Sequence, residues 1–158
     1  MTTDEYDEGT IKMTCDVLKV TLLSDTAIPP VRKHQNDAGV DLFSPVDASL
    51  APGERWNAPF DLAVEIPDGY VGMMCSRSGM AMRGISVYGA PGIIDSGYRG
   101  CIRVNLINLA QERVDIHVGD RIAQLLVVPI TLPRVEVVES LSESTDGRGD
   151  GGFGSTGR

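Results

Sequence analysis

Cysteine, histidine and long apolar runs are all scarce in this sequence. Its three cysteines, Cys15, Cys75 and Cys101, form no Cys-x-x-Cys pair. This argues against a disulfide framework and a structural zinc site, and we expect reduced, partly buried thiols. The two histidines, His34 and His117, lie far apart and are expected in turns or on the surface. No stretch approaches the roughly 20 apolar residues of a membrane span, so we expect no membrane partner.

Basic residues are also outnumbered, with 14 lysines and arginines against 22 acidic residues and a formal net charge of -8 in 158 residues. An acidic protein repels nucleic acid and anionic membranes, so an anionic ligand would need a focused site. We expect no nucleic-acid partner. Residues 1–9 are acidic and lack the apolar core of a signal peptide. The expected location is cytoplasmic, or the host cytoplasm or nucleus if the source is viral.

A long helical period is missing as well, and only 78–83 could form a turn or two of helix. Short runs with the apolar pattern of strands replace it, and Gly, Pro and Asp signals mark turns between them. The predicted strands are 17–22, 38–43, 62–66, 71–75, 85–88, 102–106, 122–128 and 135–138. Turns are predicted at 51–53, 66–69 and 118–120. Many short strands at close spacing predict an all-β fold, a jelly-roll-like barrel or sandwich.

The two ends of the chain differ in composition from its middle. Residues 1–12 are polar and acidic and are expected to be disordered, whereas 13–140 should form one β domain. The Gly-rich segment 141–158 cannot bury enough apolar surface to order itself. It is either a dispensable terminus or a flexible arm that orders on a ligand. Its formal G-x-G-x-x-G pattern is no dinucleotide fingerprint, because no βαβ unit surrounds it.

The arm nevertheless carries side chains that could contact a ligand. Arg148 can bind a phosphate through two parallel hydrogen bonds, Phe153 can stack, and Ser155 and Thr156 add hydroxyls. This composition favours a lid.

The stretch 89–100 contains four glycines, one aspartate and one tyrosine. Glycine lets the backbone approach a ligand closely, and Ile93 and Ile94 can anchor the stretch in a core beside Asp95. Taken alone, the pattern fits a binding site and a plain β-hairpin equally well.

Two further segments offer polar groups beside predicted strands. Arg77, Ser78 and Gly79 follow the strand 71–75, and 119–124 brings Asp120, Arg121 and Gln124 to the start of another. Each signal is weak by itself. For Asp120 and Arg121 a structural ion pair in a turn is favoured over ligand contact.

In this order, however, five segments resemble the five motifs of the trimeric dUTPases. They are AGVDL at 38–42, SRSG at 76–79, GIIDSGYRG at 92–100, GDRIAQ at 119–124 and RGDGGFGSTG at 148–157. The resemblance implies a jelly-roll-like β subunit in a homotrimer with active sites shared among subunits. It also implies hydrolysis of dUTP to dUMP and pyrophosphate, with Mg²⁺ as cofactor. Such an enzyme keeps uracil out of DNA and supplies dUMP for thymidylate synthesis.

The resemblance assigns roles to single residues. Asp95 is implied as the general base that activates water, and Asp41 as a holder of Mg²⁺ through water while the triphosphate ligates the ion. Tyr98 would lie under the deoxyribose. The residues implied to contact uracil or the phosphates are Gly89, Gly92, Ile93, Ile94 and the strand near Arg103 for the base, and Arg77, Ser78, Gly79 and Gln124 for the phosphates. In the arm, Phe153 would close over the base and Arg148 would bind the γ-phosphate, with Ser155 and Thr156 beside them.

Two positions depart from the family pattern, and two alternatives remain. Ser76 stands where many members have proline, and Gly89 where an asparagine side chain commonly helps to hold the nucleotide.

A related dCTP deaminase is disfavoured because Asn105, an amide, aligns with the glutamate that those enzymes need. A non-enzymatic sensor of dUTP is the other alternative, which Asp95 and Arg148 argue against.

Overall fold

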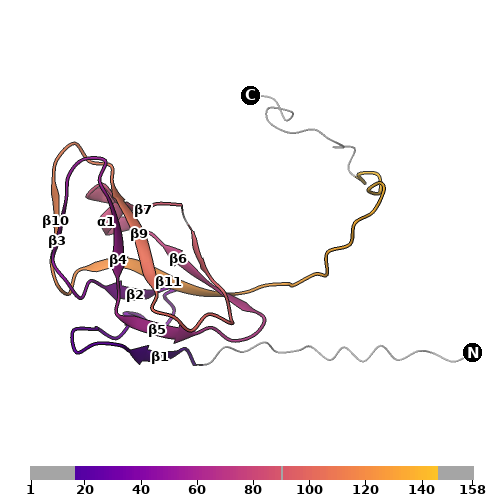
Figure 1. Ribbon diagram of the computed structural model, residues 1–158, viewed down its shortest axis with the longest axis horizontal. Helices are drawn as coiled ribbons and strands as arrows, with labels where there is room; N and C mark the ends of the chain where they lie inside the picture. The colour runs from indigo at the N-terminus through magenta and orange to yellow at the C-terminus, as the bar shows by residue number, and fades with distance from the viewer. Residues whose placement is uncertain (1–16, 90, 146–158) are drawn as a thin grey trace, which may run out of the picture.

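The computed structural model describes residues 17–89 and 91–145 of the chain. Within that part it contains eleven strands and one short helix (Figure 1). The elements are β1 Lys19–Leu22, β2 Val40–Phe43, β3 Ala48–Leu50, β4 Arg55–Pro59, β5 Leu62–Glu65, β6 Tyr70–Cys75, α1 Ser78–Met82, β7 Ile85–Val87, β8 Gly92–Ile94, β9 Arg103–Asn108, β10 Val114–Ile116 and β11 Arg121–Pro129.

The strands form four antiparallel sheets that share one core. A four-stranded sheet has the order β2-β11-β6-β8, a three-stranded sheet has the order β4-β9-β7, and β1 pairs with β5 and β3 with β10. Leu42, Leu106 and Ile116, from three of the sheets, are fully buried in the same apolar cluster as Phe60 and Leu62. Burying a side chain of this size stabilises the fold by about 1.5–3 kcal/mol. The all-β, jelly-roll-like prediction is confirmed.

Seven of the eight predicted strands are present, and every predicted end lies within two residues of the observed one. The predicted helical turn at 78–83 is confirmed as α1, and positive φ angles at Gly53, Gly69 and Gly119 confirm the three turns. The strands β3, β4, β8 and β10 were not predicted. Three of them have only three residues, which is too short for an alternating pattern to stand out.

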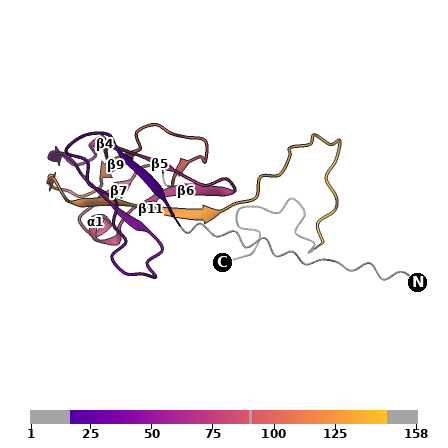
Figure 2. The same ribbon diagram turned by 90° about the horizontal axis from the view of Figure 1, so that it is seen from below.

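The strand predicted at 135–138 is wrong. After β11 the chain leaves the sheets and runs outward, as both views show (Figures 1 and 2). Val135 and Val137 are 90% and 95% exposed, and this segment pairs with no strand of the described part. An alternating apolar pattern forms a strand only beside a sheet edge, and this segment meets none within the described chain.

The minor predictions on cysteine and histidine can be placed. Cys75 and Cys101 are free and partly buried, as predicted, whereas Cys15 lies outside the described residues. His34 and His117 are exposed in turns. Within the described ranges 17–89 and 91–145, no helix is long and apolar enough to cross a bilayer.

Candidate active site

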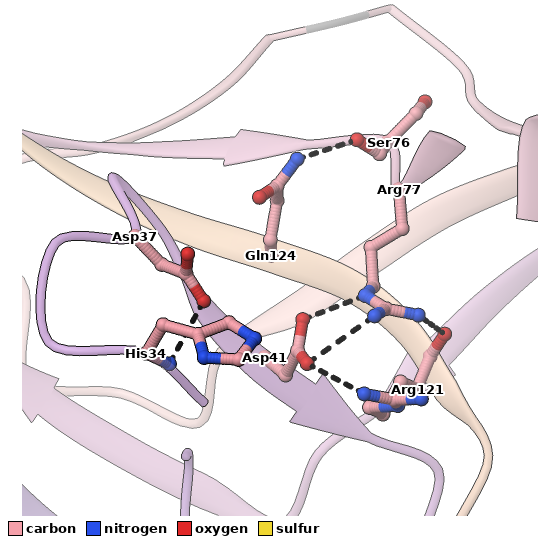
Figure 3. Close-up of polar contacts among 7 residues, drawn as sticks. All are labelled: His34, Asp37, Asp41, Ser76, Arg77, Arg121 and Gln124. Atoms are coloured by element: carbon pink, nitrogen blue, oxygen red, sulfur yellow. Dashed lines mark hydrogen bonds and ion pairs between the residues drawn. The ribbon is translucent and has the colours of Figure 1, made fainter. Parts of the chain in front are cut away.

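The predicted metal-holding residue Asp41 lies in β2 and is bound by two arginines (Figure 3). Arg77 donates from Nε to Asp41 Oδ1 at 2.6 Å and from Nη2 to Oδ2 at 3.3 Å. Arg121 donates from Nη1 to the same Oδ2 at 3.3 Å. The Asp41 side chain is only 15% exposed, and both oxygens are engaged. The result is a fixed arrangement of two guanidiniums around one carboxylate.

Sheet register brings this cluster together from three strands. Gln124 of β11 lies opposite Asp41 of β2 on one side and opposite Cys75 of β6 on the other. Its Nε2 donates to Ser76 O at 2.9 Å, while Arg77 Nη1 donates to Arg121 O at 3.3 Å. Residues from three separate motifs therefore meet because their strands are neighbours.

Gly39 makes room for this arrangement. A Cβ on Gly39 would come within 2.6 Å of Gln124 Oε1, closer than real Cβ atoms approach other atoms. A side chain at this position would push Gln124 out of place, because the residues around it are already hydrogen-bonded. The glycine of the AGVDL segment is thus explained by the amide that it faces.

These residues line a cavity of about 260 Å³. Its lining residues are Lys33, Asp37, Ala38, Gly39, Asp41, Arg77, Ser78, Arg121 and Gln124. Arg77, Ser78 and Gln124 were predicted to hold phosphates, and the structure brings all three to one cavity with Asp41. Gly79, the next residue of α1, is exposed and a Cβ there would meet nothing within 4 Å.

Asp120 and Arg121 take different partners, so the ion pair expected between them in the turn is not what holds them. Asp120 Oδ2 accepts from His117 N at 2.9 Å and lies 3.9 Å from Arg83 Nη1. Arg121 instead turns toward Asp41. Asp120 has a structural role in the turn, and Arg121 belongs to the cavity.

The predicted general base Asp95 lies on a second cavity, also of about 260 Å³. It is exposed and follows β8 directly, at the start of a turn in which Tyr98 N donates to Asp95 O at 3.0 Å. The cavity is lined by Ile93, Ile94, Asp95, Tyr98, Cys101, Ile102 and Arg103. The residues assigned to uracil, the deoxyribose and the attacking water are therefore neighbours: Ile93, Ile94, Asp95 and Tyr98, together with Arg103.

Tyr98 is held over its own turn. Its hydroxyl donates to Cys101 O at 3.0 Å, and a Cβ on Gly100 would meet the Tyr98 Oη at 2.5 Å. Only glycine at position 100 lets the ring lie there. The conformation of Tyr98 at the cavity is thus set by the chain itself.

A smaller cavity of about 110 Å³ adjoins the second one. It is lined by Met74, Val87, Tyr88, Gly89, Gly92, Ile93, Ile94, Arg103, Val104 and Asn105. The strand β8 ends its sheet, so among the described residues its outer edge has no strand partner. Arg103 itself donates to Asn57 O at 2.7 Å and also to Asn57 Oδ1.

The two halves of the predicted site lie at opposite ends of a strand pair. Gly72 of β6 faces Ile94 of β8 in antiparallel register, so Asp95 lies near the start of β6. Arg77 lies five residues beyond Gly72, after the other end of β6, with extended dihedrals of φ -93° and ψ 139°. At about 3.3 Å per residue, the sheet separates Asp95 from Arg77 by roughly 20 Å.

Some predicted residues cannot be placed, and others were missed. Arg148, Phe153, Ser155 and Thr156 lie outside the described residues. Lys33 and Asp37 line the first cavity but were not predicted. The basic run 32–34 just before the AGVDL segment was the signal that could have found Lys33.

Comparison with known proteins follows the same motifs. A family model for dUTPase matches residues 25–157. The chain is 51% identical over 141 residues to the deoxyuridine 5'-triphosphate nucleotidohydrolase of Mycobacterium sp. (strain JLS), covering 84% of this chain and 90% of that protein. It is 50% identical over 139 residues to the protein of that name from Mycobacterium leprae (strain Br4923), with the same coverage of 84% and 90%.

Solved structures agree with this. The Staphylococcus bacteriophage 80alpha dUTPase with dUPNHPP superposes with a TM-score of 0.83 at 34% identity, covering 90% of this chain and 99% of that one. A D95N mutant dUTPase from phage phi11 of S. aureus, described with a structural Mg(II) ion, superposes with a TM-score of 0.75 at 34% identity. The match covers 81% of this chain and 100% of that one.

Proposed function

The chain belongs to the dUTPase family and hydrolyses dUTP, and we propose that Asp95 is the general base of that reaction. Water attacks the α-phosphorus and the products are dUMP and pyrophosphate. Removal of dUTP keeps uracil out of DNA, and dUMP feeds thymidylate synthesis. The observation that carries the proposal is the exposed Asp95 carboxylate on the cavity that it shares with Ile93, Ile94 and Tyr98.

The phosphates bind in the first cavity. Arg77 uses three N–H groups on Asp41 and Arg121 O, so two of its five donors remain for a ligand. Ser78 adds a hydroxyl and Gln124 an amide. The Asp41 carboxylate keeps the Arg77 guanidinium in one orientation before the nucleotide arrives, which lowers the entropy cost of binding.

Asp95 takes the proton from the attacking water. Its carboxylate is exposed at the second cavity, beside Tyr98 and Ile93. A carboxylate held in line with the water contributes roughly 10²–10⁴-fold to the rate. Tyr98, fixed by its bond to Cys101 O, packs under the deoxyribose and leaves no room for a ribose 2′-hydroxyl.

Uracil is read at the free edge of β8. Successive residues of a strand direct their backbone groups to alternate sides, so only part of the Gly92–Ile94 backbone faces away from β6; these N–H and C=O groups read the base at the small cavity. Backbone groups placed for uracil meet the wrong donors and acceptors on cytosine. Buried polar groups left unpaired in this way can reduce the rate by 10⁴-fold or more.

Mg²⁺ is the cofactor, and Asp41 fits a contact through water. A carboxylate has about four lone-pair sites, and three hydrogen bonds from Arg77 and Arg121 occupy three of them. One site remains, enough for a bridging water. In the described part of the chain, no group of three aspartate, glutamate, histidine or cysteine side chains is placed to hold a metal ion. This favours an ion held mainly by the triphosphate. When bound, Mg²⁺ would supply positive charge that offsets the charge developing on the phosphates.

The arm at 141–158 closes over the nucleotide in this proposal. Arg148 binds the γ-phosphate, Phe153 stacks on the base, and Ser155 and Thr156 add hydrogen bonds. Closure excludes water from the charged contacts and strengthens them.

The active unit is a homotrimer with shared sites. A general base must lie within hydrogen-bond reach of the attacking water, yet Asp95 and Arg77 of one chain are roughly 20 Å apart. A second copy that brings its Asp95 beside the first copy's Arg77 resolves this separation. Exposed Leu132, Val135 and Val137 supply apolar surface for such an assembly. We place the trimer in the cytoplasm, or the host cytoplasm or nucleus for a viral protein, without a nucleic-acid partner.

A pyrophosphate-release assay with dUTP, dCTP, dTTP and UTP, with and without Mg²⁺, tests the function. Rapid release from dUTP alone, stimulated by Mg²⁺, is expected. No release from dUTP would refute the proposal, and ammonia release from dCTP would favour a deaminase instead. The Asn105 amide, which accepts from Asn57 at 2.6 Å, is no general base.

A further inference from the structure

Lys33 lies on the phosphate cavity but belongs to none of the five motifs. It is exposed, and its neighbours fold into a closed turn. Asp37 N donates to His34 O at 3.0 Å, His34 N donates to Asp37 Oδ2 at 3.0 Å, and Arg32 Nη1 donates to Asp37 O. Figure 3 shows His34 and Asp37 of this turn beside Asp41 and Gln124. The turn therefore fixes the backbone that carries Lys33 at the cavity wall.

The charges of the cavity are unequally committed. Arg77 and Arg121 both pair with Asp41, and the Asp37 carboxylate accepts from a backbone N–H in its own turn. Within the described part of the chain, no ion-pair partner is found for Lys33, although Asp37 lines the same cavity. Of the three cations there, Lys33 alone has all its donors uncommitted within the described residues.

We propose that the Lys33 ammonium binds the phosphate chain of the nucleotide; this inference rests on the proposed function. The protein as a whole carries a charge of -8, so a triphosphate is attracted only where cations gather locally. The Asp41 carboxylate partly neutralises the positive charge of Arg77 and Arg121. Lys33 adds a flexible point charge that can follow the phosphates as they move from substrate to product geometry.

Lys33→Met and Lys33→Arg test this, with Lys19→Met as the matched control. Lys19 of β1 is also an exposed lysine, but it pairs with Glu65 of β5 at 3.0 Å and lines none of the three cavities described above. The probes are dUTP in turnover, inorganic pyrophosphate in calorimetry and deoxyuridine, which has no phosphate, as an inhibitor. All are measured at low and high salt.

Lys33→Met should raise KM for dUTP and Kd for pyrophosphate about fivefold at low salt, the effect of losing one exposed ion pair. The difference should shrink at high salt. Deoxyuridine inhibition should not change, Lys33→Arg should restore wild-type values, and Lys19→Met should match wild type.

The inference would be overturned if KM for dUTP and Kd for pyrophosphate were the same in Lys33→Met and wild type. It would also be overturned if Lys33→Met weakened inhibition by deoxyuridine as much as it weakened pyrophosphate binding, or if Lys19→Met raised KM and Kd as much as Lys33→Met. If wild type released no pyrophosphate from dUTP, the proposed function would fail. The calorimetry with pyrophosphate would then still decide the role of Lys33.

Discussion

Arg77 is bound to Asp41 by two hydrogen bonds, from Nε to Oδ1 at 2.6 Å and from Nη2 to Oδ2 at 3.3 Å. The pair is largely screened from solvent, with side chains 23% and 15% exposed. Charge-assisted bonds of this kind fix a guanidinium as well as neutralise it. Asp41 thus has a structural task toward Arg77 that is separate from any task toward Mg²⁺.

Replacing Asp41 with asparagine should disturb both tasks. Two guanidiniums lose their countercharge, and we expect the free energy of unfolding to fall by about 1–3 kcal/mol in denaturant titrations. The Mg²⁺ concentration for half-maximal activity should rise about tenfold or more. Asp47→Asn is the control, because Asp47 is an exposed aspartate 3.8 Å from His117. An unchanged Mg²⁺ dependence would contradict the role of Asp41 toward the metal. An unchanged free energy of unfolding would contradict its structural role.

Replacing Asp95 with asparagine should keep the shape of the site but remove the proposed general base. We expect kcat to fall by roughly 10²–10⁴-fold while Kd for a non-hydrolysable dUTP analogue stays within about threefold. Asp68→Asn, in the exposed turn after Pro67, provides the control and should behave as wild type. Turnover at the wild-type rate by Asp95→Asn would mean that another group activates the water.

The strands that the sequence predicts correctly are those where apolar residues either alternate, as in 62–66, or run nearly unbroken, as in 122–128. Leu62, Val64 and Ile66 are at most 2% exposed, as their spacing requires. The strand β4 escaped prediction because Pro59 argues against a strand, yet β4 is an edge strand where proline is tolerated. Local pattern does not reveal which strand ends a sheet.

The site was predictable only in pieces. Asp41 and Gln124 lie opposite each other because β2 and β11 pair, and no periodicity in the sequence gives that order. The resemblance to dUTPases supplied the grouping instead. It did not reveal Lys33, which lies in a loop outside the motifs, nor that Asp95 and Arg77 lie at opposite ends of β6.

Replacing Gly89 with asparagine should strengthen nucleotide binding. Gly89 has φ +72° and a Cβ there would meet nothing within 4 Å. Asparagine tolerates this left-handed conformation better than most residues, and its amide would reach toward the small cavity. We expect KM for dUTP to fall several-fold with stability changed by less than about 1 kcal/mol.

Gly53→Asn is the matched control for this change. Gly53 has φ +75° and equally open surroundings, but it lies in the turn before β4, away from the small cavity. It should cost similar stability and leave KM unchanged. A KM for Gly89→Asn equal to that of wild type would show that the missing amide does not limit binding.

Deleting 147–158 should separate activity from stability. The core lies within 17–130, so the melting temperature should change by less than about 2 °C. Loss of the proposed Arg148 contact and of the proposed closure should lower kcat/KM about 10- to 100-fold. Phe153→Ala serves as a milder variant with an intact chain length. A large loss of stability on deletion would mean that the segment is structural.

Mixing two inactive variants should restore activity if sites are shared. Asp95→Asn lacks the base and Arg77→Ala lacks the phosphate contact, but a site at an interface could take Arg77 from the first and Asp95 from the second. In a trimer assembled at random from equal amounts, about a quarter of the sites would be intact. Chains unfolded together and refolded should therefore release pyrophosphate from dUTP at about a quarter of the wild-type rate. Light scattering gives the oligomeric state of the same sample.

The control mixes Asp95→Asn with the double variant Asp95→Asn, Arg77→Ala, in which no assembly can contain an intact site. It should stay inactive at every ratio. If the first mixture also stayed inactive while trimers formed, Asp95 and Arg77 would have to act within one chain. The separation of roughly 20 Å set by the β6–β8 register would then have to close by movement of the hairpin, and a site within one chain would replace the shared one.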